Sequence, residues 1–200
     1  MPISNPISRK EFGAGSIASA ALTVPVISSA NIMRPDVAAM GKIETKLAQM
    51  GLNLPEPLQM PHGIKMPFVW VRVRGKRAYI SGHVAVNPDG TLAHPLGKVG
   101  TDVTPEQGYQ SARLVALAHL GSLKRALGEL DRVTAWLRVF AMVNVAPGFN
   151  ETPRVTNGYS DLINELYGHE VGAHARSSIG MMIPLNAPVN CEAEVEIDGG

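Results

Sequence analysis

One segment limits what this chain can fold into more than any other. Residues 133–145, "VTAWLRVFAMVNV", are apolar on both sides of a predicted strand, and only Arg138 and Asn144 are strongly polar. A strand that is apolar on both sides needs cover on both sides. The helices of the same domain can cover one face. The other face must therefore meet another layer or another subunit.

A strand hairpin is predicted before this segment. Within residues 69–74, Arg72 and Arg74 alternate with apolar side chains, which is the period of a strand. Gly75 and Lys76 form a tight turn to a second strand, "RAYISGHV". After the hairpin, Asn87–Gly90 ("NPDG") is a strong turn signal.

Two helices and a closing pair of strands complete the pattern. The first helix is predicted over residues 104–130, with a capping box at its start, and the second over residues 152–168. Residues 174–197 are predicted to form a closing hairpin that turns near Pro184. The order ββ-α-β-α-ββ indicates an α+β two-layer sandwich over residues 67–198, with two helices on one face. Its bare second face predicts a closed oligomer.

Composition narrows the functional classes. The chain has 200 residues and a formal net charge of +1, with basic residues spread along it, so nucleic acid is not an expected partner. Cys191 is the single cysteine, which excludes an intrachain disulfide and a cysteine-based zinc site. The sequence predicts no metal site. It also has no stretch typical of a membrane span, so the mature protein is not expected in a membrane.

Residues 1–30 are predicted to be an export signal. Arg9 and Lys10 precede a mildly apolar segment, small residues follow it, and "SRKEF" resembles a twin-arginine motif. The alternative is a disordered or weakly helical tail. The protein is thus expected to be periplasmic or exported if the signal functions, and cytoplasmic otherwise. Residues 31–66 are predicted to hold a short helix and a proline-rich lead-in.

Several motifs occur together in one order: "YISGHVAVNPDG", "GKVGTDVTPEQGYQSARLVALAHLGSLKRALGELDRV", "TNGYSDL" and "HARSSIGMMIPLNAPV". The chain from about Ile43 to Ile197 resembles the reactive-intermediate deaminase (Rid, or YjgF) family, as a divergent branch with an N-terminal extension. The resemblance implies a chorismate-mutase-like fold with a mixed sheet. It also implies homotrimers with a barrel-like core and ligand clefts between subunits. Members hydrolyse enamine and imine intermediates to 2-keto acids, and they need no metal or organic cofactor.

The resemblance also assigns residues to a site. Arg176 matches an arginine whose planar fork can hold the carboxylate of a 2-imino acid. The expected substrate-binding residues, besides Arg176, are Phe68, Ser81, Gly82, Asn157 and Ser178. Taken as residues alone, Arg176 could instead pair with a surface acid, Asn157 could cap a helix and Gly82 could mark a strand bulge.

The last strand departs from the family pattern. Asn190 stands where archetypal members carry a glutamate thought to bind or activate the hydrolytic water, and Glu192 follows on the same strand face. An amide cannot act as a general base, but it can position a water molecule. Arg176, Asn190 and Glu192 are therefore the candidate catalytic residues. Two hypotheses remain: a deaminase, or a non-catalytic trimer that binds small carboxylates such as 2-keto acids.

Overall fold

The computed structural model of the protein describes residues 40–60, 64 and 66–199, so the predicted export signal lies outside the described residues. Three helices and five strands lie in this part of the chain, with two short 3-10 turns. The helices are α1 (Lys42–Gln49), α2 (Pro105–Leu127) and α3 (Thr152–Gly172), and the turns are η3 (Leu130–Arg132) and η4 (Pro184–Asn186). The strands are β1 (Val71–Arg74), β2 (Arg77–Val84), β3 (Val133–Asn144), β4 (Ala175–Met181) and β5 (Val189–Ile197).

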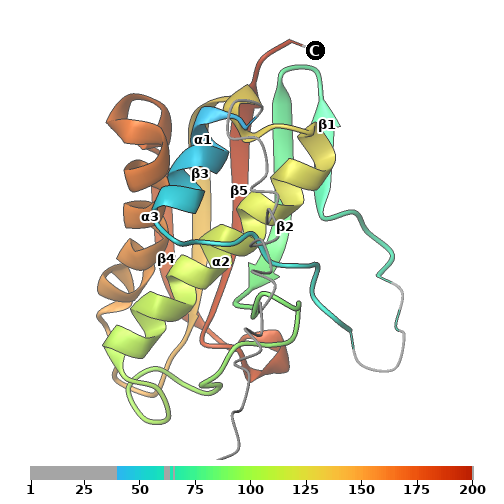
Figure 1. Ribbon diagram of the computed structural model, residues 1–200. Coiled ribbons are helices and arrows are strands. Elements are labelled where there is room, and N and C mark those ends of the chain that lie inside the picture. Colours follow the sequence, from blue (N-terminus) through green and yellow to red (C-terminus); the bar gives the residue numbers. More distant parts are fainter. Residues whose placement is uncertain (1–39, 61–63, 65, 200) are drawn as a thin grey trace, which may run out of the picture. The chain divides into compact units, whose positions relative to one another are not determined.

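The strands form one mixed sheet in the order β1-β2-β5-β3-β4. β3 and β4 are parallel, and the other neighbouring pairs are antiparallel. Both long helices pack on the same face of this sheet (Figure 1). The predicted α+β class, mixed sheet and element order are therefore confirmed.

The prediction of a closing hairpin over residues 174–197 is wrong. β4 and β5 do not pair with each other, because β3 lies between them and bonds to both. α3 carries the chain back so that β4 runs parallel to β3, as a crossover helix does. This arrangement gives hydrogen-bond partners to both edges of β3, whereas a separate hairpin would leave one of those edges unpaired.

The helices cover the face of the sheet that carries the buried side chains of β3 and β5. The predicted capping box is present, since Thr104 and Gln107 bond each other's backbone N–H at the start of α2. An apolar stripe at helical spacing along α2 is fully or nearly fully buried. Its members are Ala112, Ala116, Leu120, Leu123 and Leu127. Burial of this stripe against the sheet is the main hydrophobic contribution of α2 to stability.

α3 packs closely on α2 because a glycine stands at the contact. A Cβ atom on Gly158 would lie 2.1 Å from the carbonyl oxygen of Tyr109, so only glycine fits there without a shift of the helices. The second helix was expected to end at Gly168, and the helical geometry does break there, at φ 75° and ψ 167°. The chain then continues helically to Gly172.

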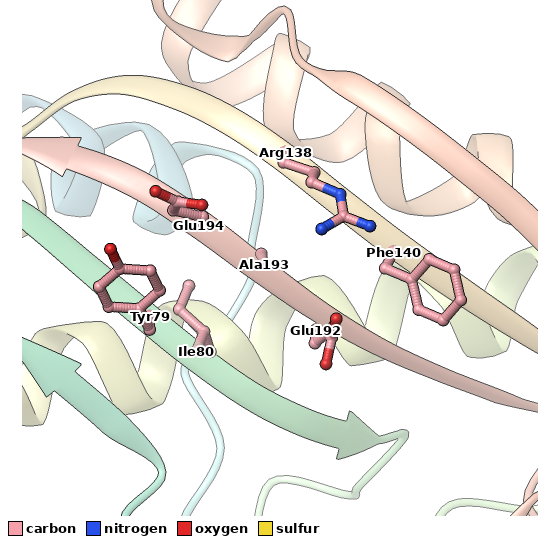
Figure 2. A pocket seen from close by; sticks show the side chains of 7 residues that line it. All are labelled: Tyr79, Ile80, Arg138, Phe140, Glu192, Ala193 and Glu194. Atoms are coloured by element: carbon pink, nitrogen blue, oxygen red, sulfur yellow. The ribbon is translucent and has the colours of Figure 1, made fainter.

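The opposite face of the sheet carries charged and aromatic side chains. Figure 2 shows Tyr79, Arg138, Phe140, Glu192 and Glu194 around a hollow of about 250 Å³ on β2, β3 and β5. The Arg138 guanidinium lies 5.7 Å from the centre of the Phe140 ring. Phe140 and the neighbouring Met142 are only half-buried. This is the face that the sequence predicted to need a second layer or subunit.

None of the helices in the described ranges combines the length and apolar character that a membrane crossing needs. In the same ranges, no three His, Cys, Asp or Glu side chains gather where they could share a metal ion.

Two buried histidines connect α2 to the sheet. His83 lies with Nδ1 2.6 Å from the Ser81 carbonyl oxygen and Nε2 2.8 Å from Ser122 Oγ. His119 lies with Nε2 2.9 Å from the Cys191 carbonyl oxygen and Nδ1 2.6 Å from the Tyr159 hydroxyl. In each case one ring nitrogen faces a carbonyl, which only accepts, so the neutral ring donates there and accepts from a hydroxyl.

Acid is expected to destabilise the fold through His83. Burial lowers the pKa of His83 from 6.5 to about 4, so the unfolded chain binds more protons between these values. Above about pH 6.5 the neutral His83 ring does not lower the free energy of unfolding. As the pH falls towards 4, protonation of this histidine in the unfolded chain lowers the free energy of unfolding by at most about 3 kcal/mol. His83→Asn keeps a donor for the Ser81 carbonyl but does not titrate. Urea unfolding at pH 7.5, 5.5 and 4.5 should therefore show a shallower pH dependence for this variant. Parallel curves for the two proteins would contradict the assignment.

Candidate functional site

Arg176 lies on the edge strand β4 and points to α3. Its Nη2 donates to Asn157 Oδ1 at 2.8 Å, and its Nη1 donates to Ser160 Oγ at 2.8 Å. A longer contact of 3.5 Å joins Nη2 to the carbonyl oxygen of Pro153. Asn157 and Ser160 are three residues apart on α3, which places both side chains on one helix face. The structure therefore brings Arg176 and Asn157 together, and Asn157 lies within α3 rather than capping it.

No acidic side chain of the described residues pairs with Arg176. All three of its contacts are to uncharged oxygens, and the ion pairs of these ranges involve other arginines and a lysine. The Arg176 side chain is half-buried, and this burial lowers its pKa from the ordinary value. A partly desolvated guanidinium without an anion is a favourable place for a ligand carboxylate. This excludes the alternative of a surface ion pair for Arg176 within the described residues.

Ser178 lies on the same strand face, two residues after Arg176. Its Oγ is 2.9 Å from Thr156 Oγ1, and its carbonyl accepts from Thr152 Oγ1 at 3.2 Å. Thr152 and Thr156 belong to the first turns of α3. Arg176, Ser178 and Asn157 thus form one group between β4 and α3, and we call this group the arginine group.

Ser81 and Gly82 lie in a second place, at a register shift in the pairing of β2 with β5. Ser81 Oγ donates to the Val69 carbonyl at 2.8 Å, and Ser81 N donates to the Trp70 carbonyl at 3.0 Å. The bulge interpretation of Gly82 is therefore correct. Phe68 precedes these residues, with its ring 5.3 Å from that of Trp70 and 46% of its surface exposed.

Asn190 approaches Gly82 closely. A Cβ atom on Gly82 would lie 2.6 Å from Asn190 Oδ1, so the absence of a side chain makes room for the amide. Asn190 Oδ1 is buried and has no hydrogen-bond partner among the described residues. A buried polar atom of this kind needs an explanation, and a bound water or ligand donor would supply one. Ser81, Gly82 and Asn190 form the second group, which we call the asparagine group.

Glu192 lies two residues further along β5 and is exposed on the open face of the sheet. It lies beside Arg138 and Phe140 at the hollow of Figure 2, and the register places it opposite the Ser81–Gly82 bulge of β2. The predicted same-face relation of Asn190 and Glu192 agrees with the burial pattern of β5. Asn190, one strand-face position away, brings its amide oxygen against Gly82.

The arginine group and the asparagine group do not meet within one chain. Asn190 pairs with Met142 of β3, and Met142 pairs with Ile179 of β4, so two strand spacings, about 10 Å, separate Asn190 from the edge strand. Arg176 also points to the helix-covered face of the sheet. Asn190 points to the opposite face, because it alternates with the residues of β5 that are buried under the helices. The predicted site residues are therefore divided between two separate places in the described part of the chain.

Neither Ser160 nor His174 was among the site residues expected from the sequence. His174 Nε2 lies 2.9 Å from Ser160 Oγ, so both residues belong to the surroundings of Arg176. The i,i+3 spacing of Asn157 and Ser160 was the signal that could have found the serine.

The fold and these residues define a protein of the chorismate-mutase-like α+β class. A family model described as "YjgF/chorismate mutase-like, putative endoribonuclease" matches residues 44–193. The chain belongs to this family, as the motifs of the sequence predicted.

Three relatives illustrate the similarity. Protein TCP17 of Trypanosoma cruzi is 33% identical over 163 residues, which are 81% of this chain and 98% of that protein. A crystal structure of a protein of unknown function from Agrobacterium tumefaciens is 33% identical, with a TM-score of 0.69 over 78% of this chain and 92% of that one. A "putative endoribonuclease" from Shewanella oneidensis is 31% identical, with a TM-score of 0.69 over 78% and 100% of the two chains.

The contact between Gly82 and Asn190 can be tested by substitution. Gly82→Ala places a methyl group where Asn190 Oδ1 lies, and we expect a loss of about 1–3 kcal/mol in the free energy of unfolding. Adding Asn190→Ala should recover most of this loss, because the amide is no longer in the way. Denaturant unfolding of both single variants and the double variant measures the coupling. Strictly additive effects would show that the two residues do not share this space.

Proposed function

We propose that the protein is a hydrolytic deaminase of 2-imino acids and their enamine tautomers. Water adds to the C2 carbon of the C=N bond, the C–N bond then breaks, and the products are a 2-keto acid and ammonia. The chemistry needs a fixed carboxylate and a positioned water molecule. It uses no cofactor, and a C=N carbon is electrophilic enough for positioning and electrostatics to contribute most of the rate enhancement.

The proposal rests on the hydrogen-bond partners of Arg176, none of which carries a negative charge. A guanidinium has five N–H donors, and three of those of Arg176 reach protein oxygens at 2.8, 2.8 and 3.5 Å. The Nε–H and one Nη1–H remain. A ligand carboxylate can bind in two-pronged geometry at Nε and Nη2 by replacing the long contact of Nη2 with Pro153. Since the protein acceptors are uncharged, the ligand would supply the anion that the site lacks. A 2-imino acid and a 2-keto acid both carry such a carboxylate.

Asn190 is our candidate for holding the water molecule. Its buried Oδ1 can accept a hydrogen bond from water beside the Ser81–Gly82 bulge. Glu192 remains the candidate general base, since a carboxylate can take the proton that an amide cannot. For Glu192 to act, its carboxylate must be brought to the substrate by the neighbouring subunit.

We propose a homotrimer as the functional assembly, with each cleft between two subunits. The separation of the arginine and asparagine groups within one chain supports this, because a site needs both. The open sheet face supports it as well, with Tyr79 44% and Ile179 38% exposed. Arg138 and Glu192 on that face supply opposite charges for contacts between copies.

A second candidate function is a non-catalytic trimer that binds small carboxylates. The observation favouring it is Asn190, which replaces the water-activating glutamate of archetypal family members. In this function Arg176 keeps its role as carboxylate clamp, and the site holds a 2-keto acid without turnover.

Arg176→Ala is expected to abolish ammonia release from freshly generated 2-aminoacrylate, and Arg176→Lys to lower kcat/KM by at least about tenfold. The reason is that alanine removes the clamp, whereas lysine keeps the charge but loses the two-pronged geometry. Arg113→Ala is the matched control, since Arg113 forms a surface ion pair with Glu165 on the helices. A wild-type rate equal to the background would reject the deaminase.

Calorimetry with pyruvate separates the two candidate functions. Binding that depends on Arg176, together with ammonia release, supports the deaminase; binding without ammonia release supports the carboxylate-binding trimer. Absence of both binding and ammonia release by the wild type would reject both.

Light scattering coupled to size exclusion should give three times the mass of one chain. Arg138→Glu should lower this mass, because it places a third negative charge beside Glu192 and Glu194 on the open face. A monomeric wild type would overturn the proposed assembly.

A further inference from the structure

Ser160 lies between Arg176 and a histidine. Its Oγ is 2.8 Å from Arg176 Nη1 and 2.9 Å from His174 Nε2, and the other ring nitrogen of His174 is 2.7 Å from the Gly172 carbonyl oxygen. These three contacts form one continuous line from the guanidinium to the backbone at the end of α3. Together with Asn157, which holds Nη2, they fix both terminal nitrogens of Arg176.

The direction of each hydrogen bond follows from the groups involved. A carbonyl oxygen only accepts, so His174 Nδ1 carries a proton and donates to Gly172. In the neutral ring Nε2 is then an acceptor, and the Ser160 hydroxyl donates to it. The lone pairs of Ser160 Oγ remain for the N–H of Arg176. Every donor of this line thus has an acceptor only while His174 is neutral.

The surroundings of His174 favour the neutral ring. Trp136 and Tyr159 pack against it, with ring centres 6.5 and 6.2 Å away. Burial and the nearby positive charge of Arg176 lower the pKa of His174. None of the described carboxylates bonds to the ring, so its role in this arrangement is that of an acceptor.

We propose that His174, acting through Ser160, is a positioning residue for the carboxylate clamp Arg176, and that the required feature is the Nε2 lone pair. This inference rests on the proposed function, because it assumes that Arg176 binds the carboxylate of the substrate. It assigns Ser160 and His174 to recognition of 2-imino and 2-keto acids. A guanidinium held by both terminal nitrogens presents its remaining donors in one orientation, which lowers the ordering cost of binding.

Two substitutions of His174 distinguish the role of the Nε2 acceptor from that of the imidazole ring as a whole. In His174→Gln the side-chain Oε1 can reach the position of Nε2 and accept from Ser160. The shorter His174→Asn can replace only the Nδ1 bond to Gly172. Ser160→Ala removes the link itself. His169→Ala is the control, since His169 lies near the end of the same helix and makes no side-chain hydrogen bond among the described contacts.

We expect Ser160→Ala and His174→Asn to weaken pyruvate binding about tenfold and to raise KM for 2-aminoacrylate similarly, with kcat changed less. His174→Gln and His169→Ala should stay within about twofold of the wild type. The Ser160→Ala/His174→Asn double variant should bind pyruvate no more weakly than Ser160→Ala alone, because both substitutions interrupt the same series of hydrogen bonds. Calorimetry and steady-state kinetics, with thermal unfolding to verify folding, measure these effects.

Three outcomes of the variants would overturn the inference. His174→Gln could bind as weakly as His174→Asn, which would show that the ring itself is needed. The double variant could lose the product of the two single effects, which would show that the residues act separately. Ser160→Ala and His174→Asn could equal a wild type that requires Arg176, which would reject the positioning role while the proposed function stands. A wild type without binding or turnover would reject the proposed function and this inference with it.

Discussion

Both halves of the candidate site depend on the pairing of β3 with a strand on each side. β4 joins one edge in parallel and β5 joins the other in antiparallel orientation. The parallel pair requires a crossover, and α3 is that crossover, so its side chains lie over β4. Asn157 and Ser160 meet Arg176 for this reason. The antiparallel partner brings Asn190 to β2, where Gly82 makes room for its amide.

The electrostatics of Arg176 follow from this architecture. Partial burial under α3 removes water from the guanidinium, and the oxygens that replace it belong to an amide, a hydroxyl and a backbone carbonyl. These groups orient a cation without neutralising it. An ion pair in the same place would satisfy the charge and leave little for a ligand. The proposed carboxylate clamp is therefore a consequence of which acceptors α3 presents to the edge strand.

The two groups face different parts of the molecule, and this gives the proposed trimer its physical basis. Two surfaces of one chain lack a partner among the described residues. One is the edge strand with the arginine group, and the other is the open sheet face with its aromatic and charged side chains. If each subunit supplies the arginine group to one neighbour and the asparagine group to the other, every cleft is complete. The presence of an amide at residue 190 makes water positioning, rather than proton abstraction by that residue, the chemistry open to the asparagine group.

The sequence by itself determined the elements that depend on local chemistry. The capping box at Thr104, the apolar stripe of α2 and the break at Gly168 were all predictable, since each rests on the periodicity of a helix or on a single backbone preference. The family motifs placed Arg176, Asn157 and the Ser81–Gly82 pair in sequence, and the need of β3 for cover on both faces was evident. Only the tertiary structure decided that β4 and β5 flank β3 instead of forming a hairpin, because strand patterns do not specify which edge a strand joins. It also decided that Ser160 links His174 to Arg176, since that contact exists only where α3 crosses the edge strand.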